Sequence, residues 1–326
     1  MTLLSIDRSA AALLPRPALP GAFDWWYADG RDAEGNGLVF ICASRLPFFP
    51  EDEPSLNLAL YRRGEPALWL LEQHPRTALL AQPCDGGFQL TLGRSVVRVT
   101  SGAGCARLDA QLDLAVPGDK RRLTGTLRVE GPSLLTDAPA QTAQPHRWVP
   151  VAPVAQVQAR LSGAATFSLD ALGYLDRNLG DAPLDKLSLR RWHWGRARRG
   201  DEALIWYALE GTDKSREGHL LRVSGGRAEL TTTPWVEEGG VLFLDGLVID
   251  PGRAVERSPF YRRSFGTVGG MPFISERCEV ARIGSYAPLV RMKLHRPAAW
   301  NSIWAPLFCG PREGRFARLL RLGGRS

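Results

Sequence analysis

The stretch Gly173-Tyr-Leu-Asp-Arg-Asn-Leu-Gly180 alternates between two kinds of side chain, and this alternation decides how it folds. In an extended chain, successive side chains point to opposite faces. A strand over these residues therefore places Tyr174, Asp176 and Asn178 on one face, and the two leucines and the arginine on the other. The sequence predicts a β-strand that aims three polar groups at one place.

The same spacing of two residues recurs in three other segments and puts bulky aromatic and hydrogen-bonding side chains on shared faces. The pairs are His146 and Trp148, Trp192 and Trp194, and Trp25 and Tyr27. Together with a buried acid, such pairs indicate a deep pocket with aromatic walls.

Length and composition favour two mainly β domains. A chain of 326 residues exceeds one ordinary small domain and can form two, each with its own core. A hydrophobic content of 44% and a charged content of 23% are typical of a globular protein and not of a disordered one. The 34 glycines and 24 prolines are scattered, which favours many short strands joined by turns over long helices.

Strand-like runs separated by turn signals form a meander in the first half of the chain. They cover residues 38–42, 56–61, 67–71, 88–92, 95–99, 110–116 and 123–130. About eight strands are enough to close a small antiparallel barrel. We therefore expect an N-terminal β-barrel domain over residues 1–140.

A second series of strand-like runs extends from residue 155 to residue 283. It predicts a C-terminal β-barrel domain over residues 141–326. Few short helices are expected, because only residues 297–304 and 315–322 show a weak helical pattern.

Charge and motifs exclude several classes of function. The net charge is +7, but the basic residues are mostly single arginines interleaved with acids and form no nucleic-acid reader motif. We expect no nucleic-acid partner, whereas peripheral contact with anionic lipid is compatible with this charge. No glycine-rich loop joins a strand to a helix as phosphate binding requires, so no nucleotide cofactor is expected.

The five cysteines are far apart and show no C-x-x-C spacing, which predicts neither a disulfide framework nor a metal site. Asp7 and Arg8 interrupt the mildly apolar first twenty residues, unlike a signal peptide. No apolar run approaches the ~20 residues of a membrane-spanning helix. We therefore expect a cytoplasmic protein, at most peripheral to the inner face of the membrane.

The chain resembles the hydroxyneurosporene synthase (carotenoid 1,2-hydratase) family, part of a lipocalin-like superfamily built from two consecutive β-barrels. The acidic-Trp-Trp-Tyr opening of that superfamily is matched at Phe23–Tyr27. The most specific pattern is His146-Arg-Trp-Val-Pro150 followed by Gly-Tyr-x-Asp-x-Asn-x-Gly-Asp-x-Pro-Leu over residues 173–184. Trp192-His-Trp-Gly-Arg196 is similar to the family's Trp-x-Trp-x-Arg strand.

The resemblance implies a hydro-lyase that adds water to a terminal isoprenoid double bond of an acyclic carotenoid by acid catalysis, without a cofactor. Asp176 is the candidate proton donor, and its pKa must rise about 3 units above ~3.9, which burial in an apolar barrel can supply. Tyr174 and Asn178 would orient the carboxyl or the water. His146, taken from the resemblance, would accept a proton from the water or reprotonate the acid.

The aromatic candidates would stabilise and enclose the substrate. Trp148 offers a ring face to a carbocation, and Trp192 and Trp194 could extend the wall of the pocket. Trp25 and Tyr27 are further candidates for substrate binding. Several candidates also have a structural alternative. Asp176 is compatible with a turn or cap, Tyr174 and Asn178 with hydrogen bonds to the loop, and His146 with a surface position at the domain junction. Trp192 and Trp194 are compatible with core packing, and Tyr27 with closure of the first barrel.

Two other classes of function remain open. Some members of the family carry histidines and a tryptophan where this chain has Leu175, Arg177 and Leu179, so a cyclase or pericyclase acting on a polyene is one alternative. The other is a binding protein for a lipid or isoprenoid, without chemistry. The sequence leaves open whether the pocket lies within one barrel or between the two, and what the oligomeric state is.

Overall fold

The structure is a computed structural model and describes residues 3–13, 22–45, 54–65, 67–116, 119–136, 146–182, 186–257 and 261–280. The two helical patterns expected after residue 296 lie outside these ranges. By internal contacts the chain divides into two compact units. The first comprises residues 1–188, 198–203 and 221–229, and the second comprises residues 189–197, 204–220 and 230–326.

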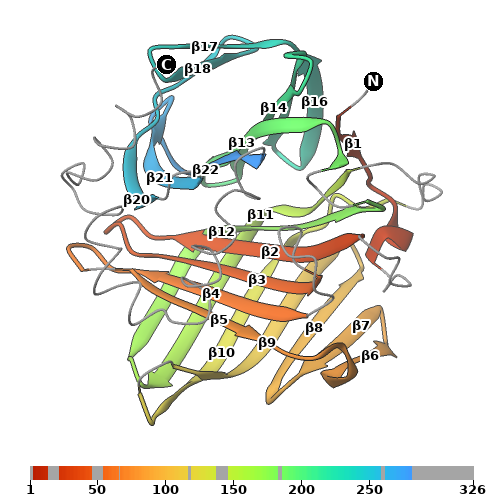
Figure 1. Cartoon of the computed structure of the whole chain (residues 1–326), viewed down its shortest axis with the longest axis vertical. Helices are drawn as coiled ribbons and strands as arrows, with labels where there is room; N and C mark the ends of the chain where they lie inside the picture. The colour runs from red at the N-terminus through yellow and green to blue at the C-terminus, as the bar shows by residue number, and fades with distance from the viewer. Residues whose placement is uncertain are drawn as a thin grey trace. The chain divides into compact units, whose positions relative to one another are not determined.

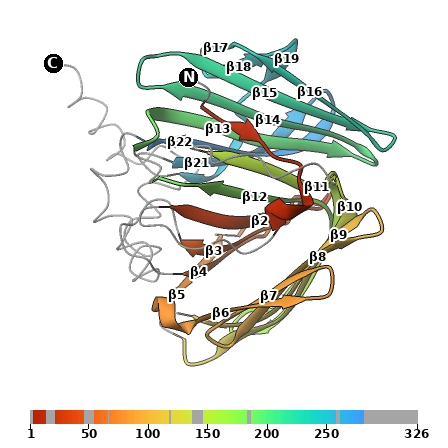
Figure 2. The same cartoon turned by 90° about the vertical axis from the view of Figure 1, so that its right-hand side faces the viewer.

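The first unit contains a twelve-stranded sheet and two short 3-10 helices, η1 (Ala10–Leu13) and η2 (Arg76–Ala78). Its strands are β1 (Ser5–Ile6), β2 (Phe23–Arg31), β3 (Gly37–Arg45), β4 (Ser55–Tyr61), β5 (Leu68–Gln73), β6 (Leu79–Cys84), β7 (Gly87–Leu92), β8 (Ser95–Gly102), β9 (Cys105–Ala115), β10 (Arg122–Pro132), β11 (Arg147–Gly163) and β12 (Phe167–Gly180). The spatial order is β5-β4-β3-β2-β12-β11-β10-β9-β8-β7-β6, and β1 adds to β11 in parallel. The sheet curls on itself (Figure 1, Figure 2).

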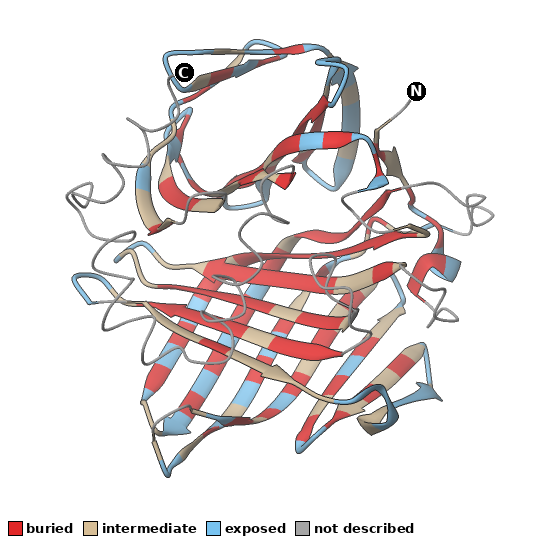
Figure 3. Ribbon diagram, in the orientation of Figure 1, coloured by how far each residue is buried: buried red, intermediate tan, exposed pale blue. Residues whose placement is uncertain are grey.

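Alternation of side chains along the strands produces the apolar core of this unit. In β9, for example, Ala106, Leu108 and Ala110 are buried while the residues between them are partly exposed. Figure 3 shows the same alternation of buried and exposed residues along neighbouring strands. The inward residues of the curled sheet form one hydrophobic cluster, as period-two patterning requires.

Strand β12 closes the sheet between segments that are far apart in sequence. It pairs antiparallel with β11 on one side and with β2 on the other. Gly173 allows the close approach, because a methyl group there would overlap a methyl of Val157 and the backbone oxygen of Asp29. The β11 partner is irregular near Pro150 and Ala152, where the register shifts.

The boundary expected between residues 140 and 141 falls inside the first unit. Strands β11 and β12 lie after that boundary, yet both hydrogen-bond into the first sheet. The Gly173–Gly180 motif therefore belongs to the first unit and not to the C-terminal one. Turn signals show where a strand ends, but they do not show which distant strand it pairs with.

A seven-stranded sheet in the order β16-β15-β14-β13-β22-β21-β20 and a three-stranded sheet in the order β17-β18-β19 form most of the second unit. The strands are β13 (Leu189–Arg199), β14 (Glu202–Gly211), β15 (Arg216–Ser224), β16 (Arg227–Thr233), β17 (Trp235–Glu238), β18 (Val241–Leu244), β19 (Leu247–Ile249), β20 (Arg253–Arg257), β21 (Tyr261–Val268) and β22 (Met271–Glu279). Its core contains Trp206, Trp235 and Phe273.

The prediction of a mainly β, antiparallel protein is confirmed. No helix in the described part of the chain is long and apolar enough to cross a membrane.

Candidate active site

Asp176 lies in the middle of β12 at the centre of a buried polar cluster. The Tyr174 hydroxyl donates to its Oδ2 at 2.8 Å, and the Trp148 indole Nε1 donates to the same oxygen at 3.0 Å. The Asn178 amide Nδ2 donates to Oδ1 at 3.0 Å. Asp176 and Asn178 are each 1% exposed, and Tyr174 and Trp148 are 0% exposed. The alternation predicted for this stretch therefore brings all three polar residues together, with Trp148 from the neighbouring strand.

His146 extends the cluster by one more hydrogen bond. Its Nε2 lies 3.1 Å from Oδ1 of Asn178. Because an amide oxygen accepts, the imidazole donates from Nε2 in this arrangement. A hydrogen-bonded chain thus runs from His146 through Asn178 to Asp176.

Aromatic rings from β2 lie beside the cluster. Trp25 pairs with Asn178 and Tyr27 pairs with Asp176 in the register of β2 and β12. The ring of Trp25 lies 6.4 Å from that of His146, and the ring of Tyr27 lies 6.3 Å from that of Tyr174. The two aromatic candidates from the start of the chain are therefore neighbours of the acid.

The cluster lies on the face of the sheet opposite to the apolar core, which corrects the expected burial inside an apolar barrel. Leu175 and Leu179, on the other face of β12, belong to the hydrophobic cluster. Arg177 lies between these leucines in the sequence. Its Nε donates to Oδ1 of Asp24 at 2.8 Å, and its guanidinium carbon lies 5.2 Å from the centre of the Trp26 ring. The period-two pattern predicted which residues share a face, but not which face covers the core.

Burial raises the pKa of Asp176 to about 8. The hydrogen bonds from Tyr174, Trp148 and Asn178 favour the ionised form and lower this pKa, whereas the negative charge of Asp29 raises it. The net result is a carboxylic acid that is still mostly protonated at neutral pH. A neutral buried carboxyl held by three donors can give a proton to a substrate.

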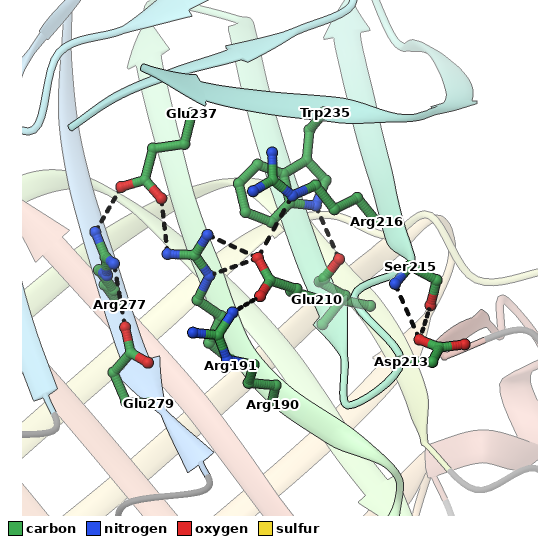
Figure 4. Close-up of polar contacts among 11 residues, drawn as sticks. Arg190, Arg191, Glu210, Asp213, Ser215, Arg216, Trp235, Glu237, Arg277 and Glu279 are labelled. Carbon is green, nitrogen blue, oxygen red and sulfur yellow. Dashed lines mark hydrogen bonds and ion pairs between the residues drawn. The ribbon is translucent and has the colours of Figure 1, made fainter. Parts of the chain in front are cut away.

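A second buried acid, Glu210 on β14, behaves in the opposite way (Figure 4). It accepts hydrogen bonds from Arg191 at 2.9 and 2.7 Å, pairs with Arg190 and lies 3.4 Å from Arg216. Burial raises the pKa of Glu210, but the hydrogen bonds and charges of Arg191 and Arg190 outweigh it and the pKa is lowered. Glu210 is therefore ionised and unsuited to donate a proton, in contrast to Asp176.

The arginine network around Glu210 continues across the second unit (Figure 4). Arg191 also pairs with Glu237 at 2.7 Å, and Glu237 binds Arg277 at 2.6 Å. The ring of Trp235 lies between the guanidinium groups of Arg191 and Arg216, at 5.2 and 4.7 Å. Alternating charges in such a network satisfy one another, which indicates a structural role.

Trp192 and Trp194, the remaining candidates, lie on β13 in the second unit. Both are buried, and they pair with Cys278 and Glu276 of β22. By alternation they occupy the face of β13 opposite to Arg191. Their contribution to a substrate site stays a prediction. Among the described residues, no three His, Cys, Asp or Glu side chains gather as metal ligands would.

One residue of the cluster was not predicted from the sequence. Asp29 on β2 is fully buried and pairs with Tyr174. It continues the spacing of two that begins at Trp25 and Tyr27, and this spacing is the signal that could have identified it.

Solved structures share this architecture. The AttH protein of Nitrosomonas europaea has a TM-score of 0.51 at 14% identity, with 82% of this chain and 99% of that chain covered. CghA in complex with Sch210972 has a TM-score of 0.58 at 13% identity, with 80% and 89% covered. At such identities the likeness concerns the fold alone, and with the curled antiparallel sheet it confirms the expected lipocalin-like architecture.

Two curated proteins are similar in sequence. The acyclic carotenoid 1,2-hydratase of Thiocapsa roseopersicina is 26% identical over 272 residues, which cover 75% of this chain and 64% of that protein. The hydroxyneurosporene dehydrogenase of Chlorobaculum tepidum is 26% identical over 225 residues, which cover 58% of this chain and 57% of that protein. The chain thus spans about three fifths of the length of these relatives. A family model matches residues 40–240, more than half of the chain and most of the polar cluster. The chain belongs to the carotenoid hydratase CrtC family.

Proposed function

We propose that this protein is a hydratase that adds water to a terminal isoprenoid double bond of an acyclic carotenoid by acid catalysis. The observation that carries the proposal is Asp176, a buried carboxyl with its pKa raised to about 8 and three hydrogen-bond donors around it. Family membership and the likeness to an acyclic carotenoid 1,2-hydratase support the choice of substrate.

In the proposed reaction, the O–H bond of Asp176 breaks and its proton forms a C–H bond at the less substituted carbon of the terminal alkene. The π electrons supply that bond and leave a tertiary carbocation. A water oxygen then bonds to the cationic carbon, and the proton it loses returns to the Asp176 carboxylate. Electrons are neither gained nor lost, so the reaction as written requires no redox cofactor.

The neighbours of Asp176 have complementary proposed roles. Tyr174 and Trp148 hold the carboxyl by hydrogen bonds, and the π system of Trp148 stabilises the nearby cation, worth about 2 kcal/mol in a desolvated site. His146, bonded to Asn178, receives or relays the proton from water. Trp25 and Tyr27 line the site, and Trp192 and Trp194 remain proposed substrate contacts.

The test is incubation of the purified protein with lycopene or neurosporene in heavy water. Deuterium at the carbon next to the new hydroxyl-bearing carbon is expected. In Asp176→Asn, product formation should fall by about 10²–10⁴-fold, the usual contribution of a general acid. Asp170→Asn, which changes an exposed carboxyl on the same strand as Asp176, is the control and should retain the chemistry. A cyclised product without deuterium would instead identify a pericyclase, and an unchanged bound polyene would identify a binding protein.

The proposed substrate dissolves in lipid, and one surface of the second unit fits peripheral contact with a membrane in the cytoplasm. Val236, Phe243 and Val248 form a cross-strand row on β17, β18 and β19, with 46%, 38% and 56% of their surface exposed. Exposed apolar rows of this kind mark interaction surfaces. Acidic Glu238 and Asp245 flank the row, so lipid binding should not depend on anionic headgroups. Flotation with zwitterionic vesicles should recover the protein, and Phe243→Ser should reduce recovery; equal recovery would refute this contact.

A further inference from the structure

A second buried carboxyl lies on the same face of the sheet as Asp176. Asp29 pairs with Tyr174 across β2 and β12, two register positions away from the pair formed by Tyr27 and Asp176. Diagonal neighbours two residues apart across an antiparallel pair lie about 7–8 Å apart. Both carboxyls are withdrawn from water, with Asp29 at 0% and Asp176 at 1% exposure. Water therefore screens their mutual repulsion poorly.

We infer that Asp29 is a positioning residue whose negative charge sets the pH range over which Asp176 remains a proton donor. This inference rests on the proposed function and deepens it. Asp29 does not hydrogen-bond to the reacting carboxyl in the way that Tyr174 does. It acts through its charge, which disfavours a second negative charge on the same face.

The surrounding groups give the two carboxyls different environments. The donors to Asp176 are the uncharged groups of Tyr174, Trp148 and Asn178. Positive charge gathers at the other end of the cluster, near Asp29. Arg31 lies two residues after Asp29, on the same face of β2. Arg198 donates from Nη1 to the carbonyl of Gly173 at 3.1 Å, and Gly173 directly precedes Tyr174, which pairs with Asp29.

The remaining neighbours add little charge near the pair. On β3, the residues opposite Asp29 and Tyr27 are Val39 and Ile41, which do not titrate. His146 is a further titratable group of the described cluster, and it lies beyond Asn178 at the far end. The charge of Asp29 thus disfavours a second charge on Asp176, and this face favours a neutral Asp176.

The test is a carbon-13 NMR titration of the aspartate carboxyl groups, with Asp176→Asn identifying the Asp176 signal. In Asp29→Asn, Asp176 should ionise about one pH unit lower than in the wild type, the lower end of the effect of a nearby like charge. Asp170→Asn is the matched control: it removes an exposed carboxyl from β12, the strand that carries Asp176, and should leave the titration in place. The alkaline limb of the pH–activity profile should move with the NMR titration.

Two further measurements keep the inference testable. Asp29→Glu retains the charge and should titrate nearly as the wild type does. If Asp29→Asn does not fold, Asp29→Ser, which also removes the charge and is smaller, takes its place in the titration. An Asp176 titration that is identical in the wild type and in the uncharged Asp29 variant overturns the inference. Absence of a hydroxylated product from the wild type would refute the hydratase proposal, whereas the NMR titration tests the coupling of the two carboxyls without substrate.

Discussion

At the scale of single residues, electrostatic surroundings give two buried acids opposite properties. Asp176 is held by neutral donors next to another carboxyl, and burial keeps its pKa high. Glu210 is also only 1% exposed, but the hydrogen bonds and charges of Arg191 and Arg190 lower its pKa. Burial alone would give both residues the same behaviour. The presence or absence of a cation in the first layer of contacts decides which carboxyl can release a proton at neutral pH.

The raised pKa of Asp176 predicts how stability depends on pH. Between about pH 4 and about pH 8 the folded protein binds a proton that the unfolded chain has lost, so the free energy of unfolding falls as pH rises through this window. Asp176→Asn removes this dependence, and relative to the wild type it should gain as much as about 5 kcal/mol on going from the acidic to the alkaline side. Urea unfolding at several pH values measures the difference. Parallel curves for the two proteins would show that Asp176 is not protonated in the fold.

Tyr174→Phe should move the ionisation of Asp176 in the other direction. The Tyr174 hydroxyl donates to Oδ2 and favours the carboxylate, so its removal raises the pKa further. We expect the alkaline limb of the pH–activity profile to shift upward by about one pH unit. A pH series of initial rates checks this, with circular dichroism to confirm the fold. A downward shift would contradict the assigned role of the hydroxyl.

At the scale of elements, one face of β12 packs into the core and the other carries the polar cluster. Leu175 and Leu179 pack into the core while Tyr174, Asp176 and Asn178 form the cluster. The strand thus fixes the site rigidly, because a shift of one residue would exchange the two faces. Gly173, at the start of the motif, lets β12 approach β11 and β2 closely enough to keep this register.

Gly173→Ala should therefore destabilise the first unit. The added methyl overlaps Val157 and the Asp29 backbone, and such overpacking costs about 1–3 kcal/mol. Gly102→Ala is the control, since a methyl group there meets nothing within 4 Å. Thermal unfolding compares the two variants. Equal melting temperatures would mean that the close approach at Gly173 does not constrain the sheet.

The sequence predicted local features of these elements better than their partners. Alternation was enough to group Tyr174, Asp176 and Asn178, and the resemblance added His146 and Trp148. Pairing of β12 with β2 depends on contacts between segments about 150 residues apart, for which local pattern carries no signal. The spacing of two could have placed Asp29 on the same face as Trp25 and Tyr27, but not beside Tyr174 of β12, and the face that covers the core could not be assigned.

At the scale of the whole molecule, the first residues of the chain fasten one end of the site. Strand β1 runs parallel to β11: Ser5 N–H donates to the His146 carbonyl and Asp7 N–H to the Trp148 carbonyl, both at 2.9 Å. Asp7 is buried and pairs with Arg147 at 3.4 Å. The backbone that carries His146 and Trp148 is therefore held by a segment about 140 residues earlier.

Asp7→Asn should weaken the attachment of the N-terminal segment to β11. It leaves Arg147 buried without its carboxylate, a change that typically costs about 3–5 kcal/mol. The melting temperature and kcat should both fall, because His146 and Trp148 lose a fixed position. Arg8→Gln changes an exposed neighbour that only donates to the Leu134 carbonyl, and its effect should be much smaller. Similar losses in both variants would argue against a specific role of Asp7.

The pairing of β2 with β12 affects how the protein folds and aggregates during its synthesis on the ribosome. A nascent chain that has emerged only as far as β11 leaves the edges of β2 and β11 open, and open edges recruit other strands. The acid and its partners come together only when residue 180 is outside the exit tunnel. Slowing translation before that residue has emerged should lengthen the exposure of both edges and increase the yield of aggregates, whereas the same pause placed after residue 188 has emerged from the tunnel should not.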